Sequence, residues 1–287
     1  MRFGVWSSQL VRPSLGETRE GLARLEAAGY SSVWFPERPV GTEAISEAAV
    51  LLAGSQTLGV GTGIASIWSR DAIAAANGAR TLNRAFDGRL RLGLGVSHAP
   101  AVAMRGHDYA RPLTAMRRYL DGMDEADARA GGRGAPRLLA ALAPRMLELA
   151  RDRADGAHTY FVPVEHTAYA RERLGREREL VVEQAVVLEQ DAGRARELAR
   201  SHTRRYLELP NYRNNLLRLG FAEHELDGGG SDELVDRVVP WGSDERVAEA
   251  LRAQVDAGAT EVLVQVIVED AQRLPVDELE RLADALA

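Results

Sequence analysis

Ala27-Ala28-Gly29-Tyr30 is the stretch that decides the fold, because it is the first of four joints of the same kind. At each joint a helix-like stretch reaches a glycine and passes within a few residues into an apolar, strand-like stretch. Glycine suits the left-handed position that ends a helix, since it has no Cβ to clash there. A strand that follows so closely is the second half of a βαβ unit. The repetition therefore predicts one parallel sheet surrounded by helices. The other three joints are Asp87-Gly88-Arg89-Leu90, Asp155-Gly156-Ala157-His158 and Ala257-Gly258-Ala259-Thr260.

Eight apolar stretches predict strands, and the stretch Leu263-Val264-Gln265-Val266-Ile267-Val268 is almost continuously apolar, as is typical of strands covered on both faces. Helices are expected between them, with Asp71 and Ser243 as N-caps. Eight strands with intervening helices predict a (β/α)8 TIM barrel, with functional residues at the carboxyl ends of the strands. An open doubly wound sheet is the alternative. The strands are expected at residues 3–6, 32–35, 58–64, 90–96, 137–141, 156–159, 181–188 and 261–268, and the helices at 15–28, 71–86, 112–130, 144–154 and 243–257.

Residues 192–242 are too long for one crossover helix. We expect helices at 192–207, 211–220 and 231–238, which together form a helical insertion between strands seven and eight. No low-complexity linker separates this insertion from the rest, so residues 1–287 are expected to form a single domain.

Composition excludes several classes of function. The net charge is −6, and no basic stripe is present to bind nucleic acid. All 36 basic residues are Arg, so neither a Schiff-base lysine nor a P-loop lysine is available. The absence of Cys excludes disulfides, thiolate nucleophiles and iron–sulfur clusters. Because no signal-peptide h-region and no run of transmembrane length are present, we expect a cytoplasmic protein without a membrane partner.

Two neighbouring strand candidates end in glycine-rich stretches, Leu58-Gly59-Val60-Gly61-Thr62-Gly63-Ile64 and Leu92-Gly93-Leu94-Gly95-Val96-Ser97-His98. Neither matches the dinucleotide fingerprint, because the third glycine is missing. One interpretation is that small residues thin the inside of a barrel strand. The other is that backbone is left bare so that a flat ligand can lie against it. Two such strands side by side favour the second interpretation.

Two histidines are expected at the mouth of the barrel. His98 follows strand four and could donate to or accept from a ligand ring near neutral pH, or it could cap the next segment. His158 ends strand six, where a structural polar residue is the alternative. The two lack an i, i+4 spacing and a nearby carboxylate cluster, so no metal is expected.

Four further stretches are candidates for the site. Glu37-Arg38 follows strand two, where a carboxylate can act as general acid or base or can form a surface ion pair with the adjacent Arg. Ala143-Pro144-Arg145 and Pro163-Val164-Glu165-His166-Thr167 begin helices, whose free N–H groups could meet phosphate. Asn211-Tyr212-Arg213-Asn214-Asn215 could line a pocket or cap the second insertion helix, and the cap is favoured.

With these residues the chain resembles the bacterial luciferase-like monooxygenase superfamily, and within it an actinobacterial branch of F420-dependent oxidoreductases. The resemblance extends over nearly the whole length. The stretches that carry it are Ser32-Val33-Trp34-Phe35-Pro36-Glu37, Gly61-Thr62-Gly63-Ile64-Ala65, Gly93-Leu94-Gly95-Val96-Ser97-His98, Ala154-Asp155-Gly156-Ala157-His158 with 163–167, and Pro210-Asn211-Tyr212-Arg213-Asn214-Asn215.

The resemblance implies a TIM barrel with a flavin or 5-deazaflavin across its mouth. It also implies a non-prolyl cis peptide at Gly63–Ile64 against the ring and a phosphate at the helix starts near Pro144 and Glu165. His98 is the first candidate for the proton-handling group and Glu37 is the second. The residues implied to bind the cofactor are Gly63, Ile64, Ala65, Val96, Ser97, His98, Ala143, Pro144, His158, Thr159, Tyr160 and Glu165.

The chain departs from the pattern of better-known members at three positions. Arg38 stands where a His often follows the acidic residue, His98 stands near the place of a glutamate, and Ala143 replaces a usual glycine. The expected function is hydride transfer between coenzyme F420 (8-hydroxy-5-deazaflavin) and a small organic substrate. The alternatives are an FMN-dependent monooxygenase that is supplied by a separate reductase, and a non-catalytic flavin-binding barrel. The resemblance also implies a homodimer.

Overall fold

The computed structural model describes residues 2–11 and 14–287, and in this part of the chain nine parallel strand segments form one closed ring. The order is β3-β2-β1-β9-β8-β7-β6-β5-β4, and pairing of β3 with β5 closes it. β3 and β4 share one place in the ring, so the barrel is the expected (β/α)8 type and the open sheet is excluded. The strands are β1 (Phe3–Trp6), β2 (Ser32–Phe35), β3 (Gly59–Thr62), β4 (Ala65–Ser66), β5 (Leu90–Gly95), β6 (Arg137–Ala140), β7 (Gly156–Thr159), β8 (Glu179–Val186) and β9 (Glu261–Val266).

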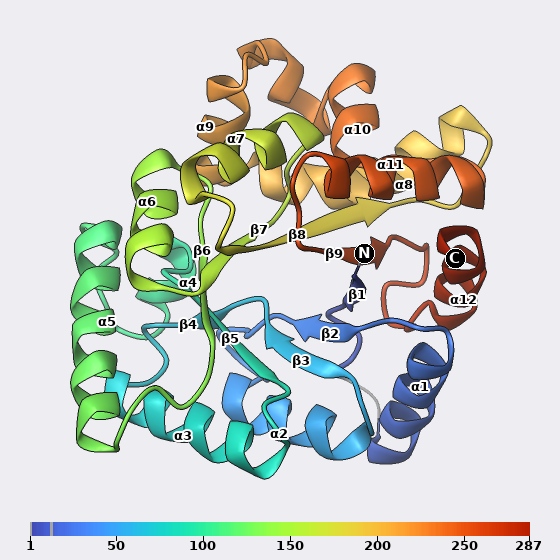
Figure 1. Ribbon diagram of the computed structural model, residues 1–287. Helices are drawn as coiled ribbons and strands as arrows, with labels where there is room; N and C mark the ends of the chain where they lie inside the picture. Colours follow the sequence, from blue (N-terminus) through green and yellow to red (C-terminus); the bar gives the residue numbers. More distant parts are fainter. Residues whose placement is uncertain (1, 12–13) are drawn as a thin grey trace.

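Helices surround the ring (Figure 1), and the segment between β8 and β9 contributes a group of its own that packs on itself. The helices of the barrel are α1 (Leu15–Ala27), α2 (Ala44–Gly54), α3 (Ala72–Ala85), α4 (Ala99–Ala103), α5 (Pro112–Arg129), α6 (Pro144–Arg153), α7 (Val164–Leu174), α11 (Asp244–Asp256) and α12 (Val276–Leu286). The group between β8 and β9 is α8 (Ala192–Leu207), α9 (Pro210–Arg218), the 3₁₀ helix η1 (Glu223–Gly229) and α10 (Asp232–Val238).

Three of the four glycine joints have the predicted conformation. Gly29, Gly88 and Gly258 have φ of 87°, 76° and 111°, which is the left-handed region. The prediction is wrong for Gly156, which lies within β7 rather than at a helix end. A Cβ on Gly156 would lie 2.1 Å from the carbonyl oxygen of Glu179, so this glycine allows β8 to approach closely.

The predicted N-caps are confirmed. The Asp71 side chain accepts from the N–H of Ala74, and the Ser243 side chain accepts from the N–H of Arg246. Both helices therefore begin one residue after the predicted cap, as capping geometry requires.

The interior of the barrel is packed around Trp34, which is fully buried. A Cβ on Gly61 would lie 2.2 Å from the Trp34 indole, so Gly61 is small because the indole occupies that space. At Gly61 the first interpretation of the glycine pattern is therefore correct, because the small residue makes room inside the barrel. The buried side chains of the interior cluster are Trp6, Trp34, Leu138, Val181 and Leu263.

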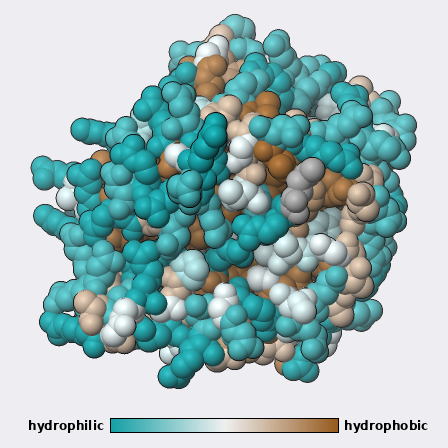
Figure 2. Space-filling view, viewed as in Figure 1, coloured by the Kyte–Doolittle hydropathy of each residue, from teal (hydrophilic) through white to brown (hydrophobic). Residues whose placement is uncertain are grey.

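The surface seen from the direction of Figure 1 is covered mostly by hydrophilic side chains, with small apolar areas between helices (Figure 2). None of the helices in the described part of the chain combines the length and the apolar composition that a membrane span requires.

Candidate functional site

A cavity of about 760 Å³ opens at the carboxyl ends of the strands. Its walls come from the ends of most barrel strands and the loops after them, and from α8 and α9. In TIM-barrel enzymes the active site lies at this end. The predicted position of the site is therefore where the structure has its large cavity.

One wall of the cavity is bare backbone. The Gly63–Ile64 peptide bond is cis, as expected, and Gly63, Ile64, Gly95 and Val96 all line the cavity. A Cβ on Gly63 would lie 2.5 Å from Nε1 of Trp6, and a Cβ on Gly95 would lie 2.6 Å from the Ile64 side chain. Glycine is needed here because no side chain fits between this backbone and its neighbours, which leaves main chain at the cavity surface.

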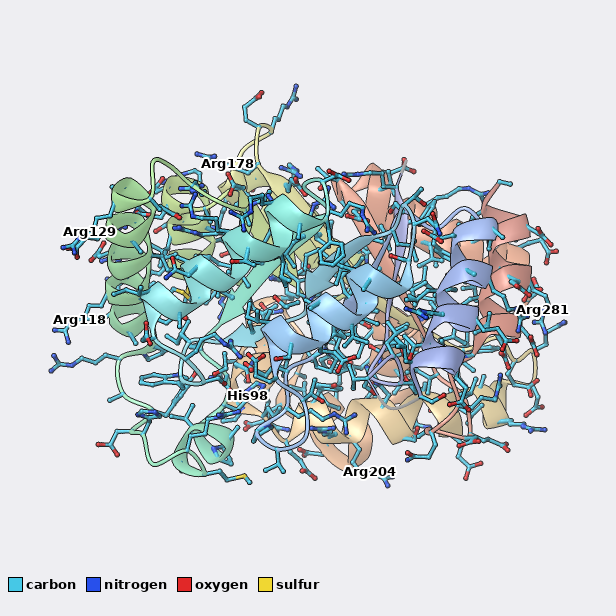
Figure 3. All side chains as sticks on the ribbon, turned by 90° about the horizontal axis from the view of Figure 1, so that it is seen from below. His98, Arg118, Arg129, Arg178, Arg204 and Arg281 are labelled. Atoms are coloured by element: carbon cyan, nitrogen blue, oxygen red, sulfur yellow. The ribbon has the colours of Figure 1, made fainter. Side chains whose placement is uncertain are left out.

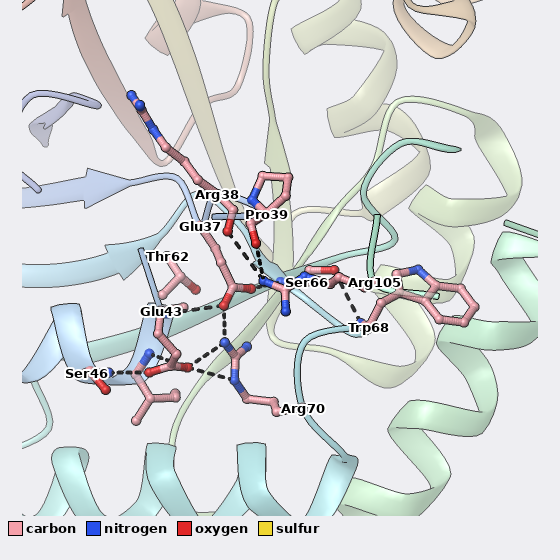
Figure 4. A network of polar contacts seen from close by, with 12 residues as sticks. Glu37, Arg38, Pro39, Glu43, Ser46, Thr62, Ser66, Trp68, Arg70 and Arg105 are labelled. Atoms are coloured by element: carbon pink, nitrogen blue, oxygen red, sulfur yellow. Dashed lines mark hydrogen bonds and ion pairs between the residues drawn. The ribbon is translucent and has the colours of Figure 1, made fainter. Parts of the chain in front are cut away.

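Glu37 lies at the edge of the cavity, with its side chain only 1% exposed (Figure 4). Its carboxylate forms an ion pair with Arg70 and accepts from the N–H of Ser66 at 2.7 Å and of Ala44 at 3.3 Å. Arg70 also pairs with Glu43 at 2.5 Å. Glu37 thus ties the end of β2 to β4 and to the start of α2.

The expected ion pair of Glu37 with the adjacent Arg38 is replaced by the pair with Arg70. The physical reason is burial: a carboxylate removed from water needs a charged partner and hydrogen bonds on both oxygens, and Arg70 with two backbone N–H groups supplies them. The Arg38 side chain instead lines the cavity.

His98 lies between the barrel and the insertion. It occupies the N-cap position of α4 without a side-chain capping bond, so the capping interpretation is wrong. The ring contacts Tyr212 at 5.8 Å between centroids and lies beside the side chain of Asn211. Burial and then the charge of Arg205 lower the pKa of His98, so its imidazole is neutral at pH 7. Figure 3 shows His98 on the side of the barrel that α8 covers.

His158 is 2% exposed and is held in one tautomer. Nδ1 lies 3.1 Å from the carbonyl oxygen of Val181, which can only accept, so Nδ1 carries the proton and Nε2 has the lone pair. In the described residues Nε2 has no hydrogen-bond partner, and it lies 3.2 Å from the place of a Cβ on Gly63. Burial lowers the pKa of His158 to about 4. The site therefore contains a neutral imidazole with an unused acceptor directly behind the cis peptide.

A group of aromatic side chains faces this backbone from the other side. The Tyr160 hydroxyl donates to Oε1 of Gln265 at 2.9 Å and lies 2.8 Å from the Tyr206 hydroxyl. The Tyr206 ring is 5.1 Å from Tyr160 and 5.3 Å from Tyr212. Of these residues only Tyr160 was predicted for the cofactor site.

The amide-rich stretch at the start of α9 lines the cavity. The N-cap of α9 is Leu209, without a side-chain capping bond, so the favoured capping interpretation is wrong. Asn211, Tyr212 and Asn214 face the cavity instead. On α8 a single face does the same, through Ser201, His202, Arg205 and Tyr206, and Leu209 follows just after this helix. The i, i+4 spacing of these polar and aromatic residues is the sequence signal that could have revealed this wall.

The structure brings together eight of the twelve predicted cofactor residues and leaves four outside the cavity lining. Ala65 packs in the core, and Thr159 is fully buried because it points to the face of β7 opposite His158 and Tyr160. Pro144 is the first residue of α6 and lies behind the lining, and Glu165 pairs with Arg237 at 2.8 Å. Those that line the cavity are Gly63, Ile64, Val96, Ser97, His98, Ala143, His158 and Tyr160.

Comparison with known proteins supports one family. Residues 1–261 match the family described as luciferase-like monooxygenase. A curated relative is the 5,10-methylenetetrahydromethanopterin reductase of Methanolobus tindarius, 29% identical over 149 residues, which are 46% of each chain. The chain thus matches less than half the length of this relative.

Two solved structures share the fold. The coenzyme F420-dependent tetrahydromethanopterin reductase from Methanopyrus kandleri is 12% identical with a TM-score of 0.74, covering 100% of this chain and 99% of that one. The oxygenating constituent of 3,6-diketocamphane monooxygenase from Pseudomonas putida, in complex with FMN, is 18% identical with a TM-score of 0.73, covering 100% and 98%. Given a family match over most of the chain, this closed barrel and the cis peptide behind its cavity, the chain belongs to the luciferase-like monooxygenase family.

Proposed function

We propose that this protein is an oxidoreductase that transfers a hydride between coenzyme F420 and a small organic substrate. The observation that carries the proposal is the wall of bare backbone at Gly63–Ile64 and Gly95–Val96 in a cavity of about 760 Å³. That volume lies within the range of pockets that take cofactors and drug-sized ligands. The curated relative is a reductase, and a reductase of the same fold is coenzyme F420-dependent, which supports the choice of a deazaflavin.

The residues of the cavity fit a ring cofactor with an anionic tail. Backbone without side chains accepts the flat face of a ring, and Nε2 of His158 supplies a buried acceptor beside it. Arg218 lines the cavity and donates to Asn215 at 2.9 Å. It lies near His166, whose ring contacts the Leu142 carbonyl just before α6. We assign the phosphate to Arg218 and the start of α6 at Ala143.

When bound, the reduced cofactor supplies the hydride, and the protein supplies position and proton handling. His98 is the residue that we propose for the proton, because its imidazole is neutral, borders the cavity and lies beside Asn211. Glu37 has both oxygens engaged, so we assign it to positioning: it holds the backbone of Ser66 next to the cis peptide.

An FMN-dependent monooxygenase is the second candidate, because an FMN-bound monooxygenase has the same fold over nearly its whole length. It would use the same cavity and a separate reductase to supply reduced flavin. A barrel that binds a flavin without turnover is the third. The single domain, the insertion at residues 192–242, the homodimer and the cytoplasmic location stay predictions.

Equilibrium titration with F420 and with FMN, followed by absorbance, separates these candidates. We expect F420 to bind more tightly, and reduced F420 to be oxidised by at least one member of a panel of ketones and enones. His98→Gln should lose at least about 100-fold in turnover with cofactor affinity unchanged. The matched control is His224→Gln, since His224 is exposed on η1. Tighter binding of FMN with oxygen consumption would favour the monooxygenase, and cofactor binding without any hydride transfer would favour the non-catalytic barrel.

A further inference from the structure

Arg205 is placed on the wall of the cavity by the geometry of α8. It lines the cavity one helical turn after Ser201, which lines it as well. Its neighbour Arg204 is exposed, as Arg205 is, but Arg204 does not line the cavity and points away from the barrel (Figure 3). Two adjacent arginines of one helix therefore differ in whether they face the cavity.

Arg205 has no anionic partner among the residues that the structure describes. In the described ranges, 2–11 and 14–287, no carboxylate lies within ion-pair distance of its guanidinium, and the side chain donates no hydrogen bond. Earlier on the same helix, Arg196 and Arg200 are both paired with Asp232 of α10. An arginine is always charged, so Arg205 presents an uncompensated cation at the cavity mouth.

More arginines than carboxylates line the cavity, although the protein has a net charge of −6. The acidic residue among its lining side chains is Glu37, whose charge is compensated by Arg70. Arg38, Arg205 and Arg218 also line the cavity. A concave site with one sign of charge concentrates ligands of the opposite sign.

Arg205 and Arg218 act on different parts of this cavity. The charge of Arg205 contributes, after burial, to the lowered pKa of His98 and of His202. The charge of Arg218 contributes instead to the lowered pKa of His166, near the start of α6. Arg205 is therefore near the proposed proton-handling residue, and Arg218 is near the proposed phosphate position.

Next to Arg205 the cavity wall is aromatic. Its guanidinium carbon lies 6.0 Å from the centre of the Tyr206 ring, which contacts Tyr160 and Tyr212. A cation beside aromatic faces is suited to a ligand with an anionic group on an apolar body.

Resting on the proposed function, we propose that the substrate is a small organic acid whose carboxylate pairs with Arg205 and whose carbon body packs on Tyr160, Tyr206 and Tyr212. The other possible source of an anion is the phosphate of the cofactor. One pair of probe ligands tests the carboxylate of the substrate, and a second pair tests the phosphate of the cofactor.

Benzoate and benzamide are the probes for the substrate, because they have nearly the same shape and differ in charge. Each is titrated by calorimetry into the protein with and without bound cofactor. Wild type and Arg204→Gln should bind benzoate about fivefold more tightly than benzamide, as expected for one accessible ion pair. Arg205→Gln should lose this preference, and Arg205→Lys should keep most of it. An equal affinity for the two probes in wild type, or a preference that survives in Arg205→Gln, would overturn the proposal.

FMN and riboflavin are the probes for the cofactor phosphate. We expect Arg205→Gln to change neither affinity, and Arg218→Gln to weaken FMN but not riboflavin. If Arg205→Gln weakens FMN selectively, the guanidinium belongs to the phosphate and the substrate assignment is wrong. If neither F420 nor FMN binds wild type while the preference for benzoate holds, the proposed function fails and the assignment of Arg205 stands.

Discussion

Gly61 and Gly63 belong to the same glycine-rich stretch and have different reasons for being glycine. Gly61 makes room for the buried indole of Trp34, whereas Gly63 contributes backbone to the cavity wall. The sequence predicted that one of two causes applied to the whole stretch. It could not separate them, because the residue that excludes a side chain at Gly61 comes from a neighbouring strand, and strand register is a property of the folded barrel.

Gly61→Ala tests the packing role. The new methyl would lie 2.2 Å from the Trp34 ring, so we expect a loss of about 1–3 kcal/mol in the free energy of unfolding. Gly16→Ala in α1 is the control, because a Cβ there meets only the Ser14 hydroxyl at 3.9 Å, and a helical alanine should be neutral or stabilising. Urea denaturation measures both. Equal stability of the two variants would show that the Trp34 ring can move aside.

At the scale of elements, the sequence predicted best where a local signal exists. Caps at Asp71 and Ser243 and the limits of α8 were predicted, since side-chain capping and apolar periodicity are local properties. α2 and α12 were not predicted. α2 is capped by Glu43, which is not a typical N-cap residue, and its apolar residues show no clear face. The partner of Glu37 could not be predicted. The strands β3 and β4 lie between Glu37 and Arg70 in the sequence, so the pairing depends on how the barrel folds.

The strand β8 carries a buried acid whose titration is measurable. Glu183 is 1% exposed, and its Oε2 accepts from the N–H of Phe161 at 3.0 Å. Burial raises the pKa of Glu183 from 4.5 to about 8. Between these values the folded protein holds a proton that the unfolded chain has lost, so stability falls as pH rises.

Glu183→Gln should remove this dependence. For the wild type the group contributes a fall of about 1.4 kcal/mol per pH unit in the free energy of unfolding across this window. In the variant the amide oxygen can still accept from Phe161, so the fold should persist. Urea midpoints measured from pH 5 to pH 8 compare the two slopes. Parallel curves for variant and wild type would mean that Glu183 is ionised in the folded protein.

At the scale of the whole molecule, three buried histidines give the barrel a marked sensitivity to acid. Burial lowers the pKa of His158 and His166 to about 4 and of His202 to about 3, from 6.5. Below pH 6.5 the unfolded chain binds protons that the folded chain does not, so stability is lost as the pH falls. Each histidine contributes about 1.4 kcal/mol per pH unit in this window. The contribution of Glu183 to the pH dependence has the opposite sign. When the contributions of Glu183 and the three histidines are added, the maximum of stability is expected near pH 6.5.

A series of urea midpoints from pH 4 to pH 8.5 measures this profile. Replacing His202 with Gln should reduce the slope of the free energy of unfolding below pH 6.5 by the contribution of one proton. The substitution removes no hydrogen bond of Nε2, since this atom has no partner in the described residues. A flat profile between pH 4.5 and 6.5 would show that the three imidazoles are hydrated in the folded protein.

The barrel itself was predictable from repetition, whereas the cavity was only partly so. The strand ends and the cis peptide followed from the glycine pattern and the resemblance, but the wall from α8 and α9 depends on how the segment between β8 and β9 packs at the mouth. The i, i+4 spacing marks a polar and aromatic face on α8, but it does not specify which surface of the barrel that face packs against. Among the residues of this wall, we assign Arg205, Tyr206 and Tyr212 to the substrate and Arg218 to the cofactor phosphate.

A crystal structure of the protein with F420 would show whether a planar ring lies on the backbone at Gly63–Ile64. We expect the ring in van der Waals contact with the Gly63–Ile64 peptide and the backbone of Val96, with the phosphate toward Arg218. A ring bound outside this cavity, or a cavity closed by its own side chains in the presence of F420, would contradict this expectation.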